Sequence, residues 1–241
     1  AAQGLMAGIN AALALKGGEP LVLDRSEAYI GTLIDDLVTK GTREPYRMMT
    51  SRSEYRLWLR QDNADRRLSA HGLRVGLVSP ERYARVQEKY ARIDAEIRRI
   101  ESTTIPPSET LDGILDAAGS APVRTGIRLG ALLRRPELSY AQLAPVDASR
   151  PALPRAEWEA AEIAIRYEGY LKRQEAQIAQ FKKLESRALP ENFDYNALAG
   201  LRLEARQKLS ALRPRSIGQA ARISGVSPAD VTVLLIALGS R

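Results

Sequence analysis

The sequence predicts a mainly α-helical protein, built as a helical bundle-like domain followed by a small C-terminal helical subdomain. Apolar residues recur at spacings of three and four over long stretches, whereas strand signals are few and short. Two segments, SPE at residues 79–81 and SPAD at residues 227–230, combine a capping serine with a proline at the first helical position. A chain of 241 residues can bury a core without disulfide support.

The charge balance of the chain favours an anionic partner. Lysine and arginine number 36 and aspartate and glutamate 29, which gives a formal net charge of +7. Nucleic acid is preferred over a membrane as this partner, and no apolar run reaches the roughly 18 residues that a membrane span requires. The chain has no cysteine, which excludes disulfides, thiolate metal sites and a thiol nucleophile within it.

The chain is expected to open with a helix over residues 1–15 that presents a small-residue face and ends at two glycines. No capping signal precedes this helix, so we expect that the chain was cut from a longer protein; a ragged natural terminus is the alternative. Ser26 can cap a second helix that runs through Val38 and ends at a glycine. Asp35 and Asp36 on this helix diverge by about 100°, which makes them a poor acid–base pair.

An arginine-rich stretch follows, GTREPYRMMTSRSEYRLWLRQDNADRRL at residues 41–68. We expect a helix that begins near Arg52, on which Arg52, Arg56 and Arg60 share one face because they are four residues apart. Guanidinium groups bind phosphate as planar forks, and neighbouring aromatic side chains can stack on unpaired bases. The phosphate-binding candidates in this stretch are Arg43, Arg47, Arg52, Arg56, Arg60, Arg66 and Arg67.

The same arginines can also be interpreted as partners of acidic residues within the fold. Glu54, Asp62 and Asp65 lie in the same stretch, and charge alone supports the two interpretations about equally. His71 is the only histidine, so it has no second histidine or cysteine with which to bind a metal, and a role at a helix C-terminus is preferred. The sequence therefore predicts no catalytic or metal-binding group of residues.

Long amphipathic helices and proline-rich joins make up the middle of the chain. Residues 80–100 carry a regular apolar stripe that must pack on a partner helix, and residues 104–154 are expected to be loop-rich with short helices. Residues 155–187 are predicted to form one helix of about nine turns, which is best interpreted as an interior helix of a bundle or hairpin. Pro190 is taken as a subdomain border.

The tail resembles a helix-turn-helix in the spacing of its last two short helices, residues 216–223 and 228–238. The second of these helices has no basic or amide side chain that could read bases. Apolar residues dominate it instead, so docking of a partner protein, or packing within the fold, is favoured over DNA recognition.

Two long strings of the sequence resemble the MnmG/GidA family of tRNA uridine 5-carboxymethylaminomethyl modification enzymes. They are the arginine-rich stretch at residues 41–68 and RPRSIGQAARISGVSPADVTVLL at residues 213–235, with LPENFDY at residues 189–195 before the second. The opening AAQGLMAGINAA resembles the segment where the flavin-binding domain of that family ends. The resemblance implies three parts: residues 1–18 as the last helix of a truncated FAD-binding domain, 19–189 as a helical tRNA-associated domain and 190–241 as a C-terminal helical subdomain for partner docking.

The resemblance further implies an FAD- and NADH-dependent cytoplasmic enzyme that works with an MnmE-type GTPase and is a homodimer in its full length. Together the two proteins attach an aminomethyl-type or carboxymethylaminomethyl group to C5 of the wobble uridine of certain tRNAs, with methylene-tetrahydrofolate as one-carbon donor. Gln3, Gly4 and Gly8 fall at flavin-contacting positions, and the seven arginines named above become tRNA-binding candidates. The partner-binding candidates are Ile217, Arg222, Val231, Leu234 and Leu235.

This chain alone is expected neither to hold FAD tightly nor to catalyse the reaction, because it has no GxGxxG phosphate-binding turn. The alternative is a stand-alone helical adaptor or nucleic-acid-binding module without catalysis. A flavin-binding reading frame fused upstream would favour the enzyme fragment over the adaptor.

Overall fold

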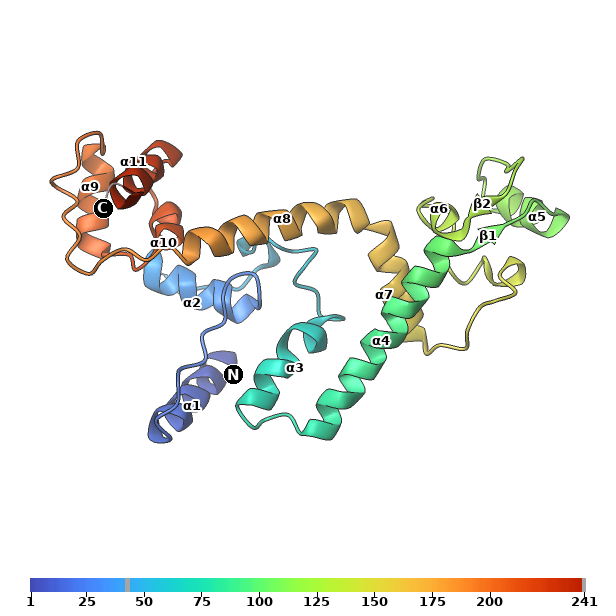
Figure 1. Ribbon diagram of the computed structural model, residues 1–241, viewed down its shortest axis with the longest axis horizontal. Coiled ribbons are helices and arrows are strands. Elements are labelled where there is room, and N and C mark those ends of the chain that lie inside the picture. The colour runs from blue at the N-terminus through green and yellow to red at the C-terminus, as the bar shows by residue number, and fades with distance from the viewer. Residues whose placement is uncertain (42–43, 240–241) are drawn as a thin grey trace. The chain divides into compact units, whose positions relative to one another are not determined.

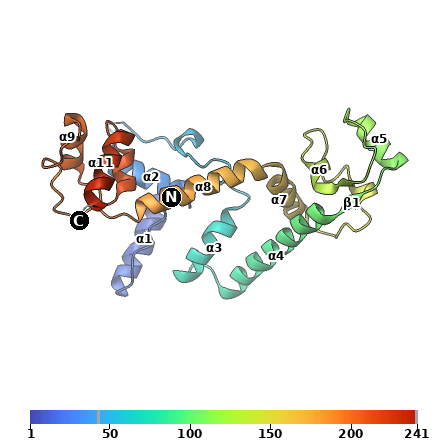
Figure 2. The same ribbon diagram turned by 45° about the horizontal axis from the view of Figure 1, so that its top comes forward.

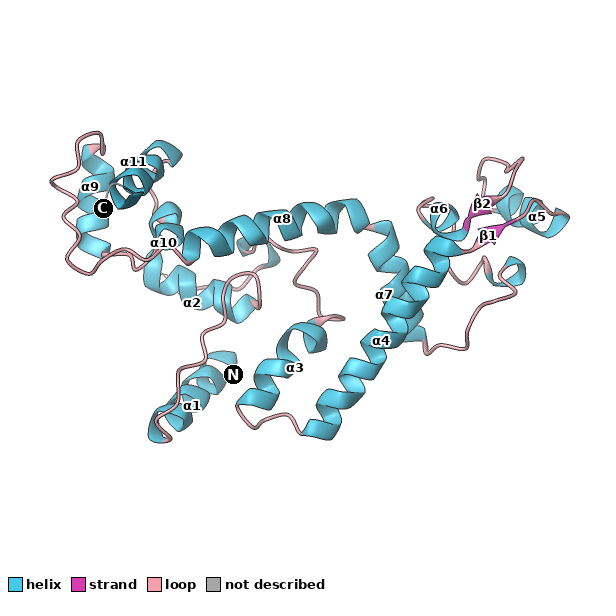
Figure 3. Cartoon of the chain, viewed as in Figure 1, coloured by secondary structure: helices cyan, strands magenta, loops and turns pink. Residues whose placement is uncertain are grey.

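The computed structural model describes residues 1–41 and 44–239, and its architecture is mainly α-helical, as predicted (Figure 3). This described part contains eleven α-helices and two short strands (Figure 1). Single 3-10 turns occur at Thr50–Arg52 and Ala144–Val146. The α-helices are α1 Ala2–Leu15, α2 Tyr29–Thr39, α3 Ala64–Arg74, α4 Pro80–Ser102, α5 Glu109–Ala117, α6 Leu129–Leu133, α7 Arg155–Arg166, α8 Glu168–Glu185, α9 Leu203–Leu212, α10 Ile217–Arg222 and α11 Pro228–Gly239.

The chain folds as two compact units that alternate along the sequence. Unit 1 consists of residues 1–3, 22–58 and 173–241, and unit 2 consists of residues 4–21 and 59–172. Each unit has its own cluster of buried apolar side chains. The domain borders predicted at residues 18 and 189 would instead divide the chain into three consecutive parts. These borders stay a prediction.

In unit 2, helices α4 and α7 lie side by side (Figures 1 and 2). The apolar stripe predicted for α4 is confirmed, because Tyr90, Ile93 and Ile100 are buried. The predicted cap is confirmed as well, since the Ser79 hydroxyl accepts a hydrogen bond from the Arg82 amide. Beyond α4, strand β1 (Thr104–Ile105) pairs antiparallel with β2 (Ile127–Arg128), and leucines of α5 and α6 complete the buried cluster.

The single helix predicted for residues 155–187 is wrong, because the chain forms α7 and α8 with Tyr167 between them. The Tyr167 amide still donates to the Ile163 carbonyl at 3.0 Å, but its ψ angle of 10° ends the helix. The apolar spacing continues through this break, so the pattern does not reveal it. The predicted cap of the second helix is also wrong: the Ser26 hydroxyl donates to Asp24, and α2 begins three residues later.

In unit 1, helices α9, α10 and α11 enclose an apolar cluster that includes Ile217 and Leu234, both without exposed surface. Ser227 and Asp230 cap α11 reciprocally: the Asp230 carboxylate accepts from the Ser227 amide at 2.8 Å, and the Asp230 amide donates to the Ser227 hydroxyl at 3.3 Å. Arg202 pairs with the same carboxylate at 2.6 Å. Hydrogen bonds from Arg202 and then from Ser227 hold the pKa of Asp230 well below its usual range.

A buried arginine, Arg25, organises the other part of unit 1. Its side chain is 2% exposed, and its Nη1 donates to Asp35 at 3.0 Å and to Asp36 at 2.7 Å. Its Nη2 donates to Glu54 at 2.7 Å and to the backbone carbonyl of Arg52 at 3.3 Å. Burial by itself would lower the pKa of Arg25, but the adjacent carboxylates outweigh burial and raise it, so the group stays a cation. One guanidinium group thus ties α2 to the segment that carries Arg52.

Asp35 extends this group of charges to the C-terminal helices. Arg222 of α10 donates to both oxygens of the Asp35 carboxylate, at 2.7 and 2.8 Å. Arg222 also pairs with Glu185 and lies 5.1 Å over the ring of Phe181. We use the name internal charge cluster for the two arginines and the carboxylates that they bind, namely Arg25, Arg222, Asp35, Asp36, Glu54 and Glu185.

The first prediction concerns Asp36, whose side chain is 3% exposed. Burial would raise its pKa, but hydrogen bonds from Lys40, Tyr46 and Arg25 outweigh burial and lower it to about 2. Because the folded pKa lies below the ordinary 3.8, the stabilisation by Asp36 is complete above about pH 4 and is lost as the pH falls through 2. Asp36→Asn is therefore expected to lower the free energy of unfolding by about 2 kcal/mol at pH 7.

Urea unfolding at several pH values, followed by fluorescence of Trp58 in a Trp158→Phe background, measures this difference in unit 1. The gap between the parent and Asp36→Asn should narrow from pH 4 to pH 2. Glu191→Gln, which changes an exposed carboxylate of the same unit, is the matched control. A gap that stays constant down to pH 2 would contradict the assignment.

The second prediction concerns the cap of α11. Asp230→Asn removes the negative charge that Arg202 and the Ser227 amide share, so the helix should open more often than the rest of unit 1. Hydrogen exchange of amides in residues 231–238 is expected to accelerate about 10-fold, roughly the effect of losing one cap. Amides of α2 serve as an internal control. Equal acceleration in both helices would mean that Asp230 supports the whole unit instead.

Candidate nucleic-acid interface

The helix predicted to begin near Arg52 is wrong. The chain makes a 3-10 turn at Thr50–Arg52, further turns follow, and the next helix, α3, begins at Ala64. The Arg52 carbonyl accepts a hydrogen bond from Arg25 rather than from an amide four residues later. The Ser53 hydroxyl accepts from the Tyr55 amide, which stabilises a turn. Arg52, Arg56 and Arg60 therefore do not share a helical face.

The predicted arginines are divided between the two units. Arg60, Arg66 and Arg67 belong to unit 2, whereas Arg47, Arg52 and Arg56 belong to unit 1. Arg43 lies outside the described residues. The structure therefore does not bring the predicted set together as one row.

In unit 2 the guanidinium groups contact acceptors of the same unit. Arg60 pairs with Asp62 at 2.9 Å, and Arg66 pairs with Asp94 at 2.9 Å. Arg67 donates to Asn63 at 3.1 Å and to the carbonyl of Arg60 at 3.0 Å. The second of the two sequence interpretations, pairing within the fold, thus holds for these three arginines.

In unit 1 the predicted arginines are exposed to solvent. Neither Arg47 nor Arg56 makes an ion pair or hydrogen bond through its side chain to any residue that the structure describes. Arg52 is exposed as well, and its guanidinium carbon lies 5.1 Å from the centre of the Tyr46 ring. These three cations are available to a ligand.

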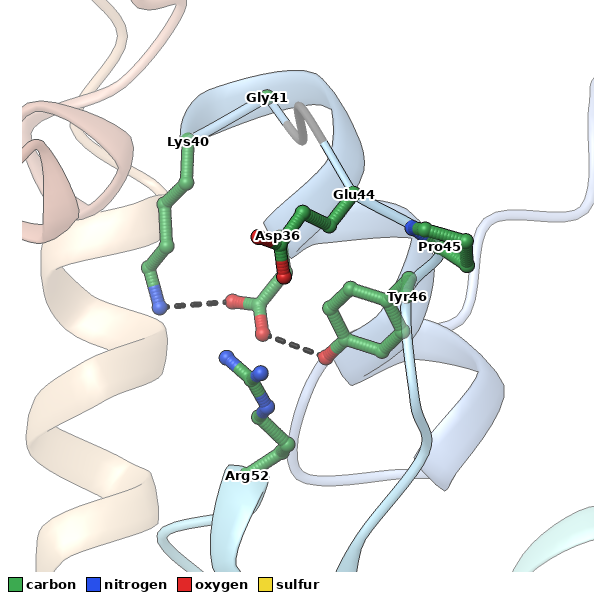
Figure 4. Close-up of a pocket in the computed structure, with 7 residues that line it drawn as sticks. All are labelled: Asp36, Lys40, Gly41, Glu44, Pro45, Tyr46 and Arg52. Carbon is green, nitrogen blue, oxygen red and sulfur yellow. Dashed lines mark hydrogen bonds and ion pairs between the residues drawn. The ribbon is translucent and has the colours of Figure 1, made fainter.

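Arg52 lies at a pocket of about 340 Å³ (Figure 4). Lys40 and Tyr46 both point at the carboxylate of Asp36, which accepts from the lysine Nζ at 2.8 Å and from the tyrosine Oη at 2.6 Å. The Arg52 guanidinium group lies beside this carboxylate and the tyrosine ring. The residues that line the pocket are Asp36, Lys40, Gly41, Glu44, Pro45, Tyr46 and Arg52.

The protonation states of the pocket suit binding rather than proton transfer. Burial and the hydrogen bond to Asp36 raise the pKa of Tyr46 to about 12, so its hydroxyl stays a donor at neutral pH. The pKa of Asp36, near 2, keeps that carboxylate ionised. Neither group titrates near pH 7, as a general acid or base would. Lys40, Tyr46 and Arg25 were not predicted from sequence as parts of this site, because their spacing gives no sign that they meet at Asp36.

The residues predicted to bind a partner protein are mostly turned inward. Ile217 and Leu234 are fully buried, and Val231 and Leu235 are partly buried against the same cluster. Arg222 belongs to the internal charge cluster. The exposed apolar side chains nearby include Leu203 and Leu212, at 68% and 48% exposure, and Val38 of α2, at 66%. Sequence reasoning missed these positions, because the apolar pattern does not separate inner from outer residues there.

The predicted cofactor-binding residues Gln3, Gly4 and Gly8 are exposed on α1. A Cβ atom built at either glycine would meet nothing within 4 Å, so this helix face is open to a close neighbour. Both glycines line an apolar groove of about 290 Å³ that Val75 and Leu77 also border. No phosphate-binding GxGxxG turn accompanies these glycines in the sequence.

The described residues show neither a metal-binding group nor a membrane-spanning helix. Their histidine, aspartate and glutamate side chains form no group of three or more that could hold a metal ion. Within the same part of the chain, no helix combines the length and apolar character that crossing a bilayer requires.

Comparison with known proteins places the chain in a family. The model of the tRNA modifying enzyme MnmG/GidA C-terminal helical domain matches residues 80–175, and the model of the MnmG/GidA C-terminal helical bundle matches residues 177–241. A tRNA uridine 5-carboxymethylaminomethyl modification enzyme MnmG from Caldicellulosiruptor saccharolyticus is 61% identical over 236 residues, which cover 98% of this chain and 38% of that protein. The enzyme of the same name from Lachnoclostridium phytofermentans is 57% identical over 238 residues, with 99% and 38% covered.

A solved structure agrees with these sequence matches. GidA from Aquifex aeolicus, in its form II crystal, superposes with a TM-score of 0.81 at 39% identity, over 98% of this chain and 37% of that one. This chain thus spans 38% of the length of the MnmG relatives that it matches. Two C-terminal family models in succession, and identities of 61% and 57%, lead to one conclusion: the chain belongs to the MnmG/GidA family and corresponds to its C-terminal part.

Proposed function

We propose that this chain is the tRNA- and partner-binding part of an FAD- and NADH-dependent cytoplasmic enzyme. With an MnmE-type GTPase, that enzyme adds an aminomethyl-type or carboxymethylaminomethyl group to C5 of the tRNA wobble uridine. The names of the relatives support tRNA as the substrate. The alternative, a stand-alone adaptor, is less favoured because the relatives that match nearly all of this chain are much longer proteins.

The observation that carries tRNA binding is the exposure of Arg47, Arg52 and Arg56 on a segment that Arg25 holds at Arg52 and Glu54. Arg25 anchors this segment from inside through Glu54 and the Arg52 carbonyl. The exposed cations therefore stand on a preformed support, which reduces the entropy lost on binding. Phosphate oxygens are the natural partners of such groups, because guanidinium binds them through two parallel N–H bonds.

The arginines of unit 2 contribute less to RNA binding in this proposal. Arg60 and Arg66 each have a carboxylate within 2.9 Å, so a phosphate would have to compete with Asp62 and Asp94. Exposed ion pairs are worth about 0–1 kcal/mol, so such competition is feasible but reduces the gain. We therefore expect the exposed arginines of unit 1 to contribute more to RNA affinity than those of unit 2, although sequence spacing alone does not distinguish them.

In this chain, the residues assigned to flavin contact all lie on α1. Gln3, Gly4 and Gly8 offer an open helix edge to a flavin, while FAD would supply the redox chemistry when bound. We assign tight binding of FAD and of NADH to the part of the relatives that this chain does not span. In the same way, homodimer formation is assigned to the full-length protein.

A third prediction tests RNA binding in the full-length protein. Arg47→Gln with Arg56→Gln removes two exposed cations and should make the plot of log K against log salt concentration shallower by about 1.5. Arg60→Gln with Arg66→Gln removes the same charge from paired positions and is the matched control, with a smaller change expected. Filter binding or fluorescence anisotropy with tRNA between 50 and 300 mM salt measures both slopes.

Two results would contradict this proposal. A parent protein without measurable affinity for tRNA would remove the function altogether. Equal slopes for the parent and the Arg47/Arg56 variant would place the interface elsewhere on the chain.

Partner docking is proposed for a groove of about 340 Å³ in unit 1, bordered by Val38, Leu212, Arg213 and Arg215. Its exposed apolar side chains and two arginines suit a partner surface that is apolar with acidic residues around it. Deleting residues 213–241 is a poor test, because it would remove Ile217 and Leu234 from the core. Substitutions at the groove surface avoid this problem.

The fourth prediction therefore uses Val38→Glu with Leu212→Glu. Introduced carboxylates should repel an acidic, apolar partner, so affinity for the GTPase is expected to fall about 10-fold or more. Affinity for tRNA should stay within about twofold. Val22→Glu, at a 76% exposed apolar residue of the same unit that does not line the groove, is the control. Unchanged GTPase binding by the groove variant would exclude this surface.

A further inference from the structure

The pocket at Tyr46 and Arg52 is more ordered than a basic surface that attracts RNA only by its charge would have to be. The Tyr46 ring and the Arg52 backbone are held in place. The Tyr46 hydroxyl donates to Asp36 at 2.6 Å, which fixes the ring. The Arg52 amide donates to the Met49 carbonyl at 3.0 Å, and its carbonyl accepts from Arg25 at 3.3 Å, which fixes the backbone. The Arg52 guanidinium carbon lies over this ring, 5.1 Å from its centre.

Hydrogen-bond donors remain available at this pocket. The guanidinium group of Arg52 donates to no acceptor among the described residues, although it carries five N–H bonds. The Lys40 amine, on a side chain that is 42% exposed, uses one contact to Asp36. Asp36 already accepts from Arg25, Lys40 and Tyr46, so its charge is largely compensated. The pocket therefore suits a ligand that presents strong acceptors, of which phosphate is the best matched to a guanidinium fork.

The rim of the pocket narrows the ligand class further. Glu44 lines the pocket too, and its carboxylate has no ion pair or hydrogen bond to another described residue. An acceptor of this kind disfavours a bare phosphate dianion and suits a ligand that also carries O–H or N–H donors. Ribose hydroxyls and the N–H groups of a base meet that requirement. A volume of about 340 Å³ lies within the range of small-ligand pockets. A stacked arginine and tyrosine also provide a flat surface on which a base can lie.

We propose that this pocket binds one unpaired nucleotide of the RNA, with its phosphate on Arg52 and Lys40 and its ribose or base donors on Glu44. This inference rests on the proposed RNA-binding function and names the part of the RNA that the pocket takes. A nucleotide must leave the base stack to enter, so single-stranded RNA fits and a continuous duplex does not. Arg47 and Arg56 lie outside the pocket and contribute attraction without this selectivity.

The test uses the full-length protein and a fluorescein-labelled pentauridylate, followed by anisotropy at fixed salt. Arg52→Gln is expected to weaken binding about 10-fold, the loss of a charge-assisted fork, whereas Arg56→Gln, with the same change of charge outside the pocket, should weaken it less than about threefold. Arg52→Lys keeps the charge but loses the planar fork, so it should resemble Arg52→Gln. Tyr46→Phe releases the ring from Asp36 without a change of charge and should weaken binding about threefold.

Competition and crosslinking separate a nucleotide from a simple anion. Uridine 5′-monophosphate should displace the labelled RNA at concentrations at least 10-fold lower than inorganic phosphate or uridine require. A pentamer with a central 4-thiouridine should crosslink on irradiation to a peptide that contains residues 44–52. Thermal unfolding curves of all variants check that the fold is kept, which is expected because Arg52 is exposed and Tyr46 loses only one hydrogen bond.

Three results would overturn the inference. Equal losses of affinity for Arg52→Gln and Arg56→Gln, or unchanged affinity for Arg52→Lys, would mean that the pocket attracts RNA only through its positive charge. Competition by inorganic phosphate as strong as that by the nucleotide would make it an anion site only. In each of these cases tRNA binding with a normal salt slope would persist, so the proposed function would stand while this inference fails; a parent protein that binds no RNA at all would instead remove the function.

Discussion

A guanidinium group taken out of water joins α2 to the segment of unit 1 that carries Arg52. Arg25 is 2% exposed, and a charge in that position must be matched by anionic partners, since an unmatched buried charge costs several kcal/mol. Asp35, Asp36 and Glu54 provide the match. Because Arg25 also binds the Arg52 carbonyl, the segment from Tyr46 to Glu54 must follow the geometry of the cluster. The exposed cations of the proposed interface thus owe their position to a cation that no ligand can reach.

Two sets of arginines from one short stretch take different roles. Arg47, Arg52 and Arg56 face solvent or the pocket. Arg60, Arg66 and Arg67 contact acceptors within unit 2. The same side-chain chemistry serves both roles, because a guanidinium fork matches a carboxylate as well as it matches a phosphate. What separates the two sets is whether an acceptor lies within reach. Asp62 and Asn63 are close in sequence to Arg60 and Arg67, whereas Asp94 of α4 reaches Arg66 only through tertiary packing.

The sequence predicted what is encoded locally. The mainly helical fold, the apolar stripe of α4 and the serine caps at Ser79 and Ser227 follow from spacing and from side chains within four residues. The helix expected from Arg52 was wrong: the chain makes a 3-10 turn there, and the Arg52 carbonyl accepts a hydrogen bond from Arg25, 27 residues away in sequence. The break at Tyr167 was missed because apolar periodicity continues across it. The pocket was missed for the same reason as the false helix: Lys40, Tyr46 and Arg52 meet only through Asp36.

The bond between Asp35 and Arg222 joins residues that are 187 positions apart in the chain. Ribosomes add about 5–20 residues per second, so Asp35 is added to the chain roughly 10 to 40 s before its partner. Residues 59–172, the larger part of unit 2, are translated in that interval. The carboxylates of α2 therefore emerge before most of unit 2, yet the unit they belong to is the last to close.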